Sequence, residues 1–352
     1  TAFAVELTVG ARFLASLIPD IPQWITVVVI SSIAFIYVSL GGFKATVVTD
    51  RVQMVFIWLL LFAMLLFYGV YIYNNGTTVS FASIPDNLKS ITWSNSLLAF
   101  VLGILFMNLF MYVSNMGLWQ RIAGSNEPET VVKGMWGSVY KTALSWGLFV
   151  VVAIGAFMVV SPVENENLLI TLIKAIDNSV IGKITIFTIV LGLYGAMLST
   201  ASTQLIAVSH TIYEDILAPI RKIDLKDRLP SRKELGLSRK ILFLSAILSV
   251  GLVEILRAGG FSVADLAFAI YGAALGMTPA IILSLYWSRN NLKKISIYAY
   301  ISITIGFLSG WGSAIAGKVL GDGNLVFLSP LVGFTTASII LGIGAMVKKN
   351  KS

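Results

Sequence analysis

The chain has 352 residues, of which 57% are hydrophobic and only 12% are charged, with a mean hydropathy of +0.87. A soluble domain of this size carries roughly twice that share of charge, so a water-exposed surface over most of the chain is excluded. Cysteine is absent and His210 is the single histidine, which excludes disulfides, thiolate metal sites and histidine-cluster metal sites and disfavours a hydrolase triad. We therefore expect an all-α integral membrane protein that is not an enzyme and has no cofactor.

Ten apolar segments follow one another along the chain, and each is predicted to form a membrane-spanning helix of about 20 residues. They lie at about residues 3–18, 22–40, 46–73, 95–118, 136–160, 182–212, 239–256, 262–287, 295–317 and 325–347. The apolar runs are continuous rather than alternating, which argues against a β-barrel. Because the chain begins with Thr1 inside an apolar segment, we expect it to be a fragment of a longer protein.

The net charge of +8 gathers on one side of this predicted topology, which argues against nucleic-acid binding. Alternate connections hold 19 of the 25 Lys and Arg residues. By the positive-inside rule these connections are cytoplasmic, so the C-terminus lies inside and the chain is a multi-pass protein of the cell membrane, plasma or inner. The most basic segment, Arg221–Lys240, is expected to be a solvated inner loop.

Two connections carry local patterns. In Glu164–Val180, five apolar residues share one helical face, which predicts an amphipathic helix that lies on the membrane surface or caps the bundle. These residues are Leu168, Leu169, Leu172, Ile173 and Ile176. The sequence Glu127-Pro128-Glu129-Thr130 predicts the start of a helix.

Asp50 is an ionisable residue at predicted membrane depth, where a charge is costly and indicates function. It follows a predicted turn at Gly41–Thr46 and lies near the start of a helix that continues to Tyr73. Two interpretations remain open. The carboxylate stabilises the helix N-terminus or pairs locally with Lys44 or Arg51, or it is a cation ligand buried between helices and open toward the cytoplasm.

The span 182–212 places small and hydroxylated residues within about 60° of one direction on a helical wheel. They are Gly192, Gly195, Ala196, Ser199, Ser202, Thr203 and His210. Small residues favour close helix packing. Hydroxyl groups favour a hard cation, which needs five or six oxygen ligands. Four hydroxyl oxygens are available beside the Asp50 carboxylate, those of Ser199, Thr200, Ser202 and Thr203. His210 is a structural hydrogen-bonding residue or a proton relay.

Polar residues interrupt the span 95–118, namely Asn108, Ser114, Asn115 and Gly117, followed by Gln120 and Arg121. This pattern suits a discontinuous helix whose freed backbone groups bind a substrate. The alternative is that Asn108 and Asn115 make interhelical hydrogen bonds worth about 1 kcal/mol each. In the first span, Glu6 lines a cavity or pairs with a residue outside the chain.

Three stretches resemble the sodium/solute symporter family, which includes bacterial proline, sialic acid and sugar symporters and the sodium/glucose cotransporters. The first is Gly41-Gly42-Phe43-Lys44-Ala45 leading to Val48-Thr49-Asp50-Arg51-Val52-Gln53, in which Val48 replaces the usual Trp. The second is Leu198-Ser199-Thr200-Ala201-Ser202-Thr203-Gln204-Leu205 running to Tyr213-Glu214-Asp215-Ile216. The third is Gly272–Trp287.

The resemblance implies a fold of two inverted five-helix repeats with the substrate and Na⁺ near the midplane. Residues 1–352 would form a single membrane transport domain that lacks its first helices. Residues 1–73 would then be the last three helices of the first repeat, residues 95–287 the second repeat, and residues 295–347 two additional helices.

Carried over by position, the resemblance implies that Ser199 and Thr200 bind one Na⁺. It implies that Asp50, Ser202 and Thr203 bind a second, which only some members have. Asn108 falls where sugar-transporting members place a substrate-contacting Asn, but Met111 before Tyr112 does not match their aromatic gate. The candidate substrate residues are Asn108, Tyr112, Asn115 and Glu6.

These observations predict sodium-coupled symport of a small organic solute by alternating access. The expected partners are Na⁺, the solute and the lipid bilayer, with no nucleic acid and no obligate protein partner. Two alternatives remain open: a membrane sensor module of the same fold, and a proton-coupled transporter that uses Asp50 or His210.

Overall fold

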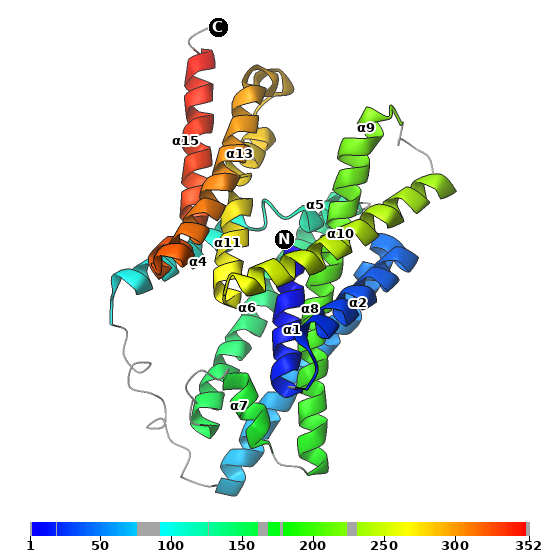
Figure 1. Ribbon diagram of the computed structural model, residues 1–352, viewed down its shortest axis with the longest axis vertical. Coiled ribbons are helices and arrows are strands. Elements are labelled where there is room, and N and C mark those ends of the chain that lie inside the picture. The colour runs from blue at the N-terminus through cyan, green and yellow to red at the C-terminus, as the bar shows by residue number, and fades with distance from the viewer. Residues whose placement is uncertain are drawn as a thin grey trace. The chain divides into compact units, whose positions relative to one another are not determined.

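The computed structural model describes residues 2–18, 20–75, 92–125, 127–160, 168–176, 179–223 and 231–349, and the regular structure in these ranges is entirely helical (Figure 1). The predicted all-α class is confirmed. Most of the predicted outer segment 74–94 lies outside the described residues.

Seven of the described helices are long and apolar enough to cross a membrane, so the predicted count of about ten is not confirmed. The first and fourth predicted spans form helices of only 16 residues each, α1 (Ala2–Leu17) and α4 (Asn95–Phe110). The second and third predicted spans both lie in α2 (Gln23–Asn75), whose helical backbone is interrupted between them at Gly42. A hydropathy window measures the length of an apolar run, but it does not show where the helix within that run ends or breaks.

The chain forms two compact units, each described by itself. The N-terminal unit comprises residues 2–91 and 121–254, and the C-terminal unit comprises residues 92–120 and 255–352. The predicted division into inverted repeats stays a prediction.

In the N-terminal unit, α2 is broken at Gly42, whose φ of 56° and ψ of −151° are not helical. A positive φ is readily adopted only by glycine, so the break occurs at a glycine inside the predicted turn Gly41–Thr46. The two halves of α2 run in different directions (Figure 1). The Nε of Arg239, in α10 (Arg232–Ala258), donates to the carbonyl oxygen of Ser39 at 3.0 Å. Arg239 thereby satisfies a carbonyl near the end of the first half.

The second half of α2 packs along α8 (Val180–His210), and glycine permits their close approach. A Cβ at Gly192 would lie 2.6 Å from the Leu60 Cβ and 2.8 Å from the Phe56 carbonyl oxygen. A Cβ at Gly195 would meet only Gln53 atoms, at 3.6 Å or more. Close packing through small residues, one of the two interpretations of this face, therefore holds at Gly192.

Helices α6 (Pro128–Val159) and α7 (Leu168–Ala175) cover the second half of α2. α6 begins at Pro128, as the sequence predicted. In and just after α7, Leu172, Ile173 and Ile176 are buried in a cluster with residues of α2, α6 and α8. This amphipathic segment therefore packs its apolar face against the neighbouring helices, and its predicted placement on the membrane surface stays a prediction.

The expectation that all of Arg221–Lys240 is a loop is wrong, because the residues from Arg232 onward are helical. After α8 come a π-helical segment, η3 (Thr211–Leu217), and α9 (Ala218–Ile220), and α10 begins at Arg232. The backbone N–H of Ser231 donates to the Glu234 carboxylate at 2.6 Å, and the Glu234 N–H donates to the Ser231 hydroxyl at 3.3 Å. This reciprocal cap starts the helix despite its charge, and residues 224–230 lie outside the described ranges.

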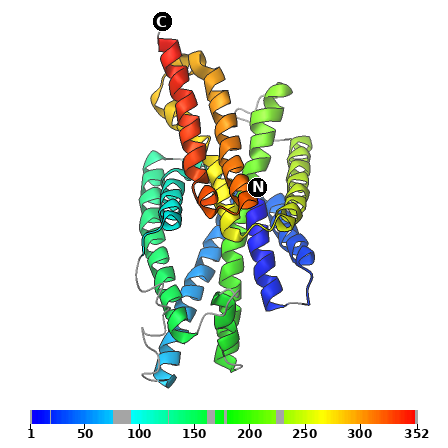
Figure 2. The same cartoon turned by 60° about the vertical axis from the view of Figure 1, so that its left-hand side comes forward.

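The C-terminal unit contains α4, α11 (Val263–Leu275), α12 (Thr278–Tyr286), α13 (Arg289–Leu320), α14 (Gly323–Phe327) and α15 (Ser329–Lys349). α13 and α15 run side by side (Figure 2). Glycines bring the backbones together here too, since a Cβ at Gly276 would lie 2.5 Å from the backbone of Gly306 and Phe307. Lys318 Nζ lies 3.2 Å from the Asp265 carboxylate and ties α13 to the start of α11.

Substitution of Gly192 by Ala should destabilise the protein by about 1–3 kcal/mol, because the new methyl group forces the α2 backbone away. Gly195→Ala is the matched control on the same helix face, and it should be neutral or slightly stabilising because Ala favours helix. Thermal inactivation in detergent measures both variants. Equal loss of stability in the two would contradict close packing at Gly192.

Candidate ion-binding site

Asp50 lies on the second half of α2, about two turns after the break at Gly42. Its side chain is 20% exposed and accepts hydrogen bonds at both oxygens. The Ser199 hydroxyl donates to Oδ1 at 2.6 Å, and Arg121 Nη2 donates to Oδ2 at 2.5 Å. The same Arg121 nitrogen donates to the Thr203 hydroxyl oxygen at 3.0 Å. The four residues form one connected group, called the Asp50 cluster below.

Helix α8 supplies the hydroxyls of this cluster. Ser199 and Thr203 are one turn apart and contact Asp50 and Arg121, whereas the hydroxyls between them bond to their own helix. Ser202 Oγ donates to the Ser199 carbonyl oxygen at 3.0 Å, and Thr200 Oγ1 donates to the Ala196 carbonyl oxygen at 3.4 Å. Such bonds use the hydroxyl hydrogen and leave the oxygen lone pairs available as acceptors.

Two further polar side chains lie beside the cluster. Gln53 is one turn after Asp50 on α2 and is only 9% exposed, and among the described residues no hydrogen-bond donor reaches its Oε1. The Tyr37 hydroxyl donates to the Leu198 carbonyl oxygen at 2.9 Å and lies near Gln53 and Ser202. A buried acceptor without a donor is costly, so the Gln53 oxygen indicates a place for a cation or a hydrogen-bond donor.

The sequence did not indicate Arg121 as the partner of Asp50. Of the two local partners expected for Asp50, Lys44 and Arg51, neither forms an ion pair with it in the described part of the chain. Arg121 belongs to α5 (Met116–Ala123), 71 residues away in sequence, and no spacing rule joins such positions. Gln53 could have been found, because a residue three positions after Asp50 shares its helix face.

The structure brings together Asp50, Ser199 and Thr203 directly, with Ser202 and Thr200 on the same stretch of α8. Ser199, which the resemblance assigned to a different ion site, donates to the Asp50 carboxylate. The division of these residues between two sodium sites stays a prediction.

The predicted discontinuous helix is confirmed. α4 ends at Phe110 and α5 begins at Met116, with turns between them. The Asn115 carbonyl Oδ1 accepts from the Gly117 N–H at 2.9 Å, so Asn115 caps α5. Asn108 is exposed and donates to the Ile104 carbonyl oxygen of its own helix at 2.9 Å. Tyr112 in the turn is 50% exposed.

These three substrate candidates belong to the C-terminal unit, whereas the fourth, Glu6, belongs to the N-terminal unit. Glu6 is partly buried on α1 and has no hydrogen bond or ion pair within the described ranges. His210 is partly exposed at the last position of α8. The substrate roles of all four candidates stay predictions.

Comparison with known families decides the class of the protein. The sodium:solute symporter family matches residues 1–294, which include every residue of the Asp50 cluster. The chain belongs to the sodium:solute symporter family. No curated protein sequence matches it. The predicted family is confirmed, and this symporter belongs to a family of membrane transporters rather than enzymes.

The Asp50–Arg121 pair should couple energetically when both side chains are replaced. Asp50→Asn, Arg121→Gln and the double variant form a cycle whose coupling energy should be about 1 kcal/mol, since Arg121 remains 42% exposed. The control is Glu129 with Lys133 on α6, a pair with side chains 76% exposed that should couple by about 0.3 kcal/mol. Denaturant unfolding in micelles measures both cycles. Equal coupling would show that the Asp50 pair has no special environment.

Proposed function

We propose that this symporter couples the inward movement of Na⁺ to the uptake of a small organic solute by alternating access. The observation that carries the proposal is the Asp50 cluster. It joins one carboxylate on α2 to a hydroxylated face of α8, beside a buried amide oxygen of Gln53 that has no donor.

The chemistry of these groups suits Na⁺. A hard cation takes oxygen ligands and needs five or six of them. Asp50 supplies the negative charge, and the hydroxyls of α8 and the Gln53 amide supply neutral oxygens. The α8 hydroxyls are those of Ser199, Thr200, Ser202 and Thr203. The Ser199, Thr200 and Ser202 hydroxyls can donate their hydrogens as they now do and still present a lone pair to the ion, while the Thr203 oxygen now accepts from Arg121.

Arg121 gives the site a competing cation. Its guanidinium holds an Asp50 oxygen and the Thr203 hydroxyl, so a Na⁺ at the same oxygens must displace it or bind against its charge. Arg121 also belongs to the short helix α5 that follows the break after α4. Displacement of Arg121 would therefore release α5 from α2 and α8, which links ion binding to a movement of the helix.

The driving force is sufficient for concentration of a solute. One Na⁺ entering down a potential of about −100 mV releases roughly 2.3 kcal/mol, and a tenfold sodium gradient adds about 1.4 kcal/mol. One ion per cycle then sustains a solute gradient of several hundredfold. We place the C-terminus in the cytoplasm and assign solute contacts to Asn108, Tyr112, Asn115 and Glu6.

Asp50→Asn and Arg121→Gln should shift the apparent Na⁺ affinity in opposite directions. Loss of the carboxylate removes the charged ligand and should weaken Na⁺ binding about tenfold, while loss of the guanidinium should strengthen it by a similar factor. Uptake by reconstituted vesicles at a series of Na⁺ concentrations measures both, with Lys133→Gln as a control for charge. A shift of the same sign in both variants would remove Arg121 as a competitor.

Ser199→Ala combined with Thr200→Ala should abolish Na⁺-stimulated uptake, because two oxygens are lost from the α8 face. Thr188→Ala is the matched control, since its hydroxyl lies on the same helix and donates to the Ile184 carbonyl oxygen. Normal uptake by the double variant would refute the proposed ion site. Undiminished uptake when choline replaces Na⁺ would favour proton coupling through Asp50 or His210.

A further inference from the structure

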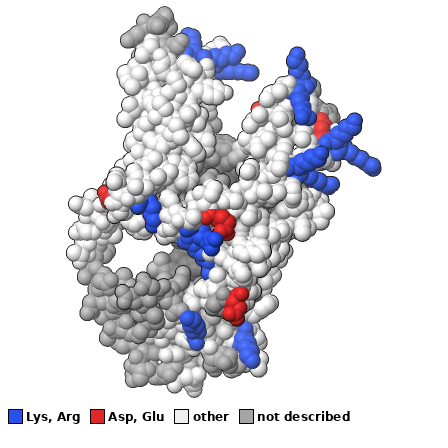
Figure 3. All heavy atoms as spheres, in the orientation of Figure 1, with Lys and Arg blue, Asp and Glu red and all other residues white. Residues whose placement is uncertain are grey.

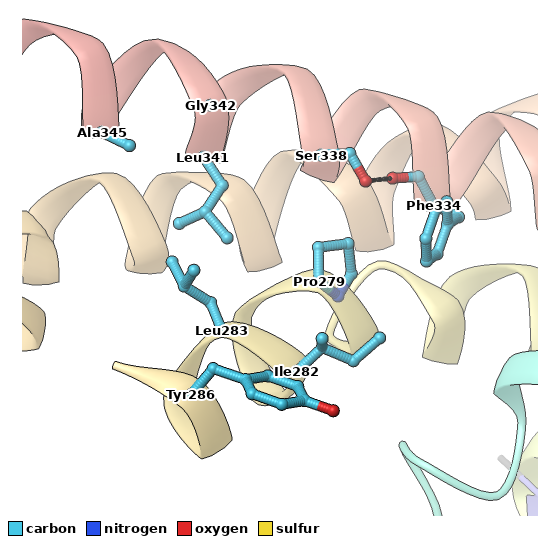
Figure 4. Close-up of a pocket in the computed structure, with 9 residues that line it drawn as sticks. All are labelled: Pro279, Ile282, Leu283, Tyr286, Phe334, Ser338, Leu341, Gly342 and Ala345. Carbon is cyan, nitrogen blue, oxygen red and sulfur yellow. Dashed lines mark hydrogen bonds between the residues drawn. The ribbon is translucent and has the colours of Figure 1, made fainter. Parts of the chain in front are cut away.

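A groove of about 350 Å³ lies between α12 and α15 in the C-terminal unit (Figure 4). Its lining comes from these two helices alone: Pro279, Ile282, Leu283, Tyr286, Phe334, Ser338, Leu341, Gly342 and Ala345. Both helices belong to spans long and apolar enough to cross a membrane. In a membrane, an apolar groove between two such helices suits an apolar occupant.

The lining of the groove favours an apolar occupant. The Ser338 hydroxyl donates to the Phe334 carbonyl oxygen of its own helix at 2.8 Å, as Figure 4 shows, so its hydrogen is already used. The Tyr286 side chain lies at the end of α12 and is 83% exposed. Gly342 contributes no side chain, and a Cβ built there would meet no atom within 4 Å. The interior of the groove thus offers apolar contact and space.

A group of basic side chains follows the end of the groove-lining helix α12, which ends at Tyr286. Arg289, Lys293 and Lys294 lie in the first two turns of α13, which begins directly after α12, and all three are exposed. None of them forms an ion pair within the described ranges. A Cβ at Gly344 would lie 2.4 Å from the Tyr298 side chain, so the last turns of α15 lie beside the first turns of α13. Figure 3 shows basic side chains at the end of the unit where α13 begins.

We propose that this surface binds one anionic phospholipid, with an acyl chain in the groove and the phosphate on Arg289, Lys293 and Lys294. The apolar groove and the adjacent positive charge match the two parts of such a molecule, and basic pockets between membrane helices bind anionic headgroups in this way. Each basic residue near the membrane surface contributes about fivefold to the affinity for an anionic lipid. The inference depends on the membrane location alone and not on the proposed ion coupling.

Native mass spectrometry of the full-length protein, delipidated and then titrated with phosphatidylglycerol or phosphatidylcholine, tests the site. One phosphatidylglycerol should bind in preference to phosphatidylcholine. Lys293→Gln with Lys294→Gln should lower the phosphatidylglycerol affinity by about 25-fold and leave phosphatidylcholine unchanged. The matched control is Lys44→Gln with Lys141→Gln, which removes the same charge from two other exposed lysines and should change neither affinity.

Gly342→Phe should fill the groove and reduce binding of both lipids, whereas Gly312→Phe, at another open glycine on α13, should not. A phospholipid with a diazirine in its acyl chain should crosslink mainly to α12 and α15, which keeps the test valid if a variant fails to fold. Equal binding of the two lipids or crosslinks spread evenly over all helices would overturn the proposal. A dimer that forms without lipid would also overturn it, because a second copy of the chain would then cover the groove.

Discussion

The close approach of α8 to the second half of α2 is the constraint on which the candidate site depends. At Gly192 the backbones are too near for any side chain, and about two turns further along, the hydroxyl face of α8 reaches Asp50 at Ser199. Hydrogen bonds require oxygen atoms within about 3 Å, which two helices carrying large residues at this seam would not achieve. The small residues therefore serve both packing and polar contact, so the two interpretations of this face are compatible.

The packing of α8 against α2 also determines how the negative charge of Asp50 is balanced. A carboxylate with one-fifth of its surface exposed is stable in a membrane bundle when a cation or several donors face it. Arg121 and Ser199 fill that role for Asp50, and the pair forms a neutral unit between α2, α5 and α8. In the proposed ion site one cation exchanges for another, so the carboxylate stays neutralised throughout, and competition from Arg121 lowers the affinity for Na⁺.

Local features were predictable from the sequence because they depend on spacing along a single helix. The wheel of α8 placed Ser199 and Thr203 on one face, the glycines before Asp50 indicated the break at Gly42, and the polar residues after Asn108 indicated the end of α4. The first turns of α10 were misassigned to a loop, because a high density of charge outweighed the capping pattern of Ser231 and Glu234. Partners distant in sequence could not be predicted.

The sequence by itself determined the membrane class, the helical content, the family and the residue types able to bind a hard cation, because composition and periodicity reflect the solvent and the helix repeat. Only the tertiary structure decided that Asp50 pairs with Arg121, that Gln53 presents a buried oxygen without a donor, and that α12 and α15 leave a groove beside basic residues. These features arise from the packing of separate helices, and the distance between two side chains on different helices is set by that packing rather than by their positions in the chain.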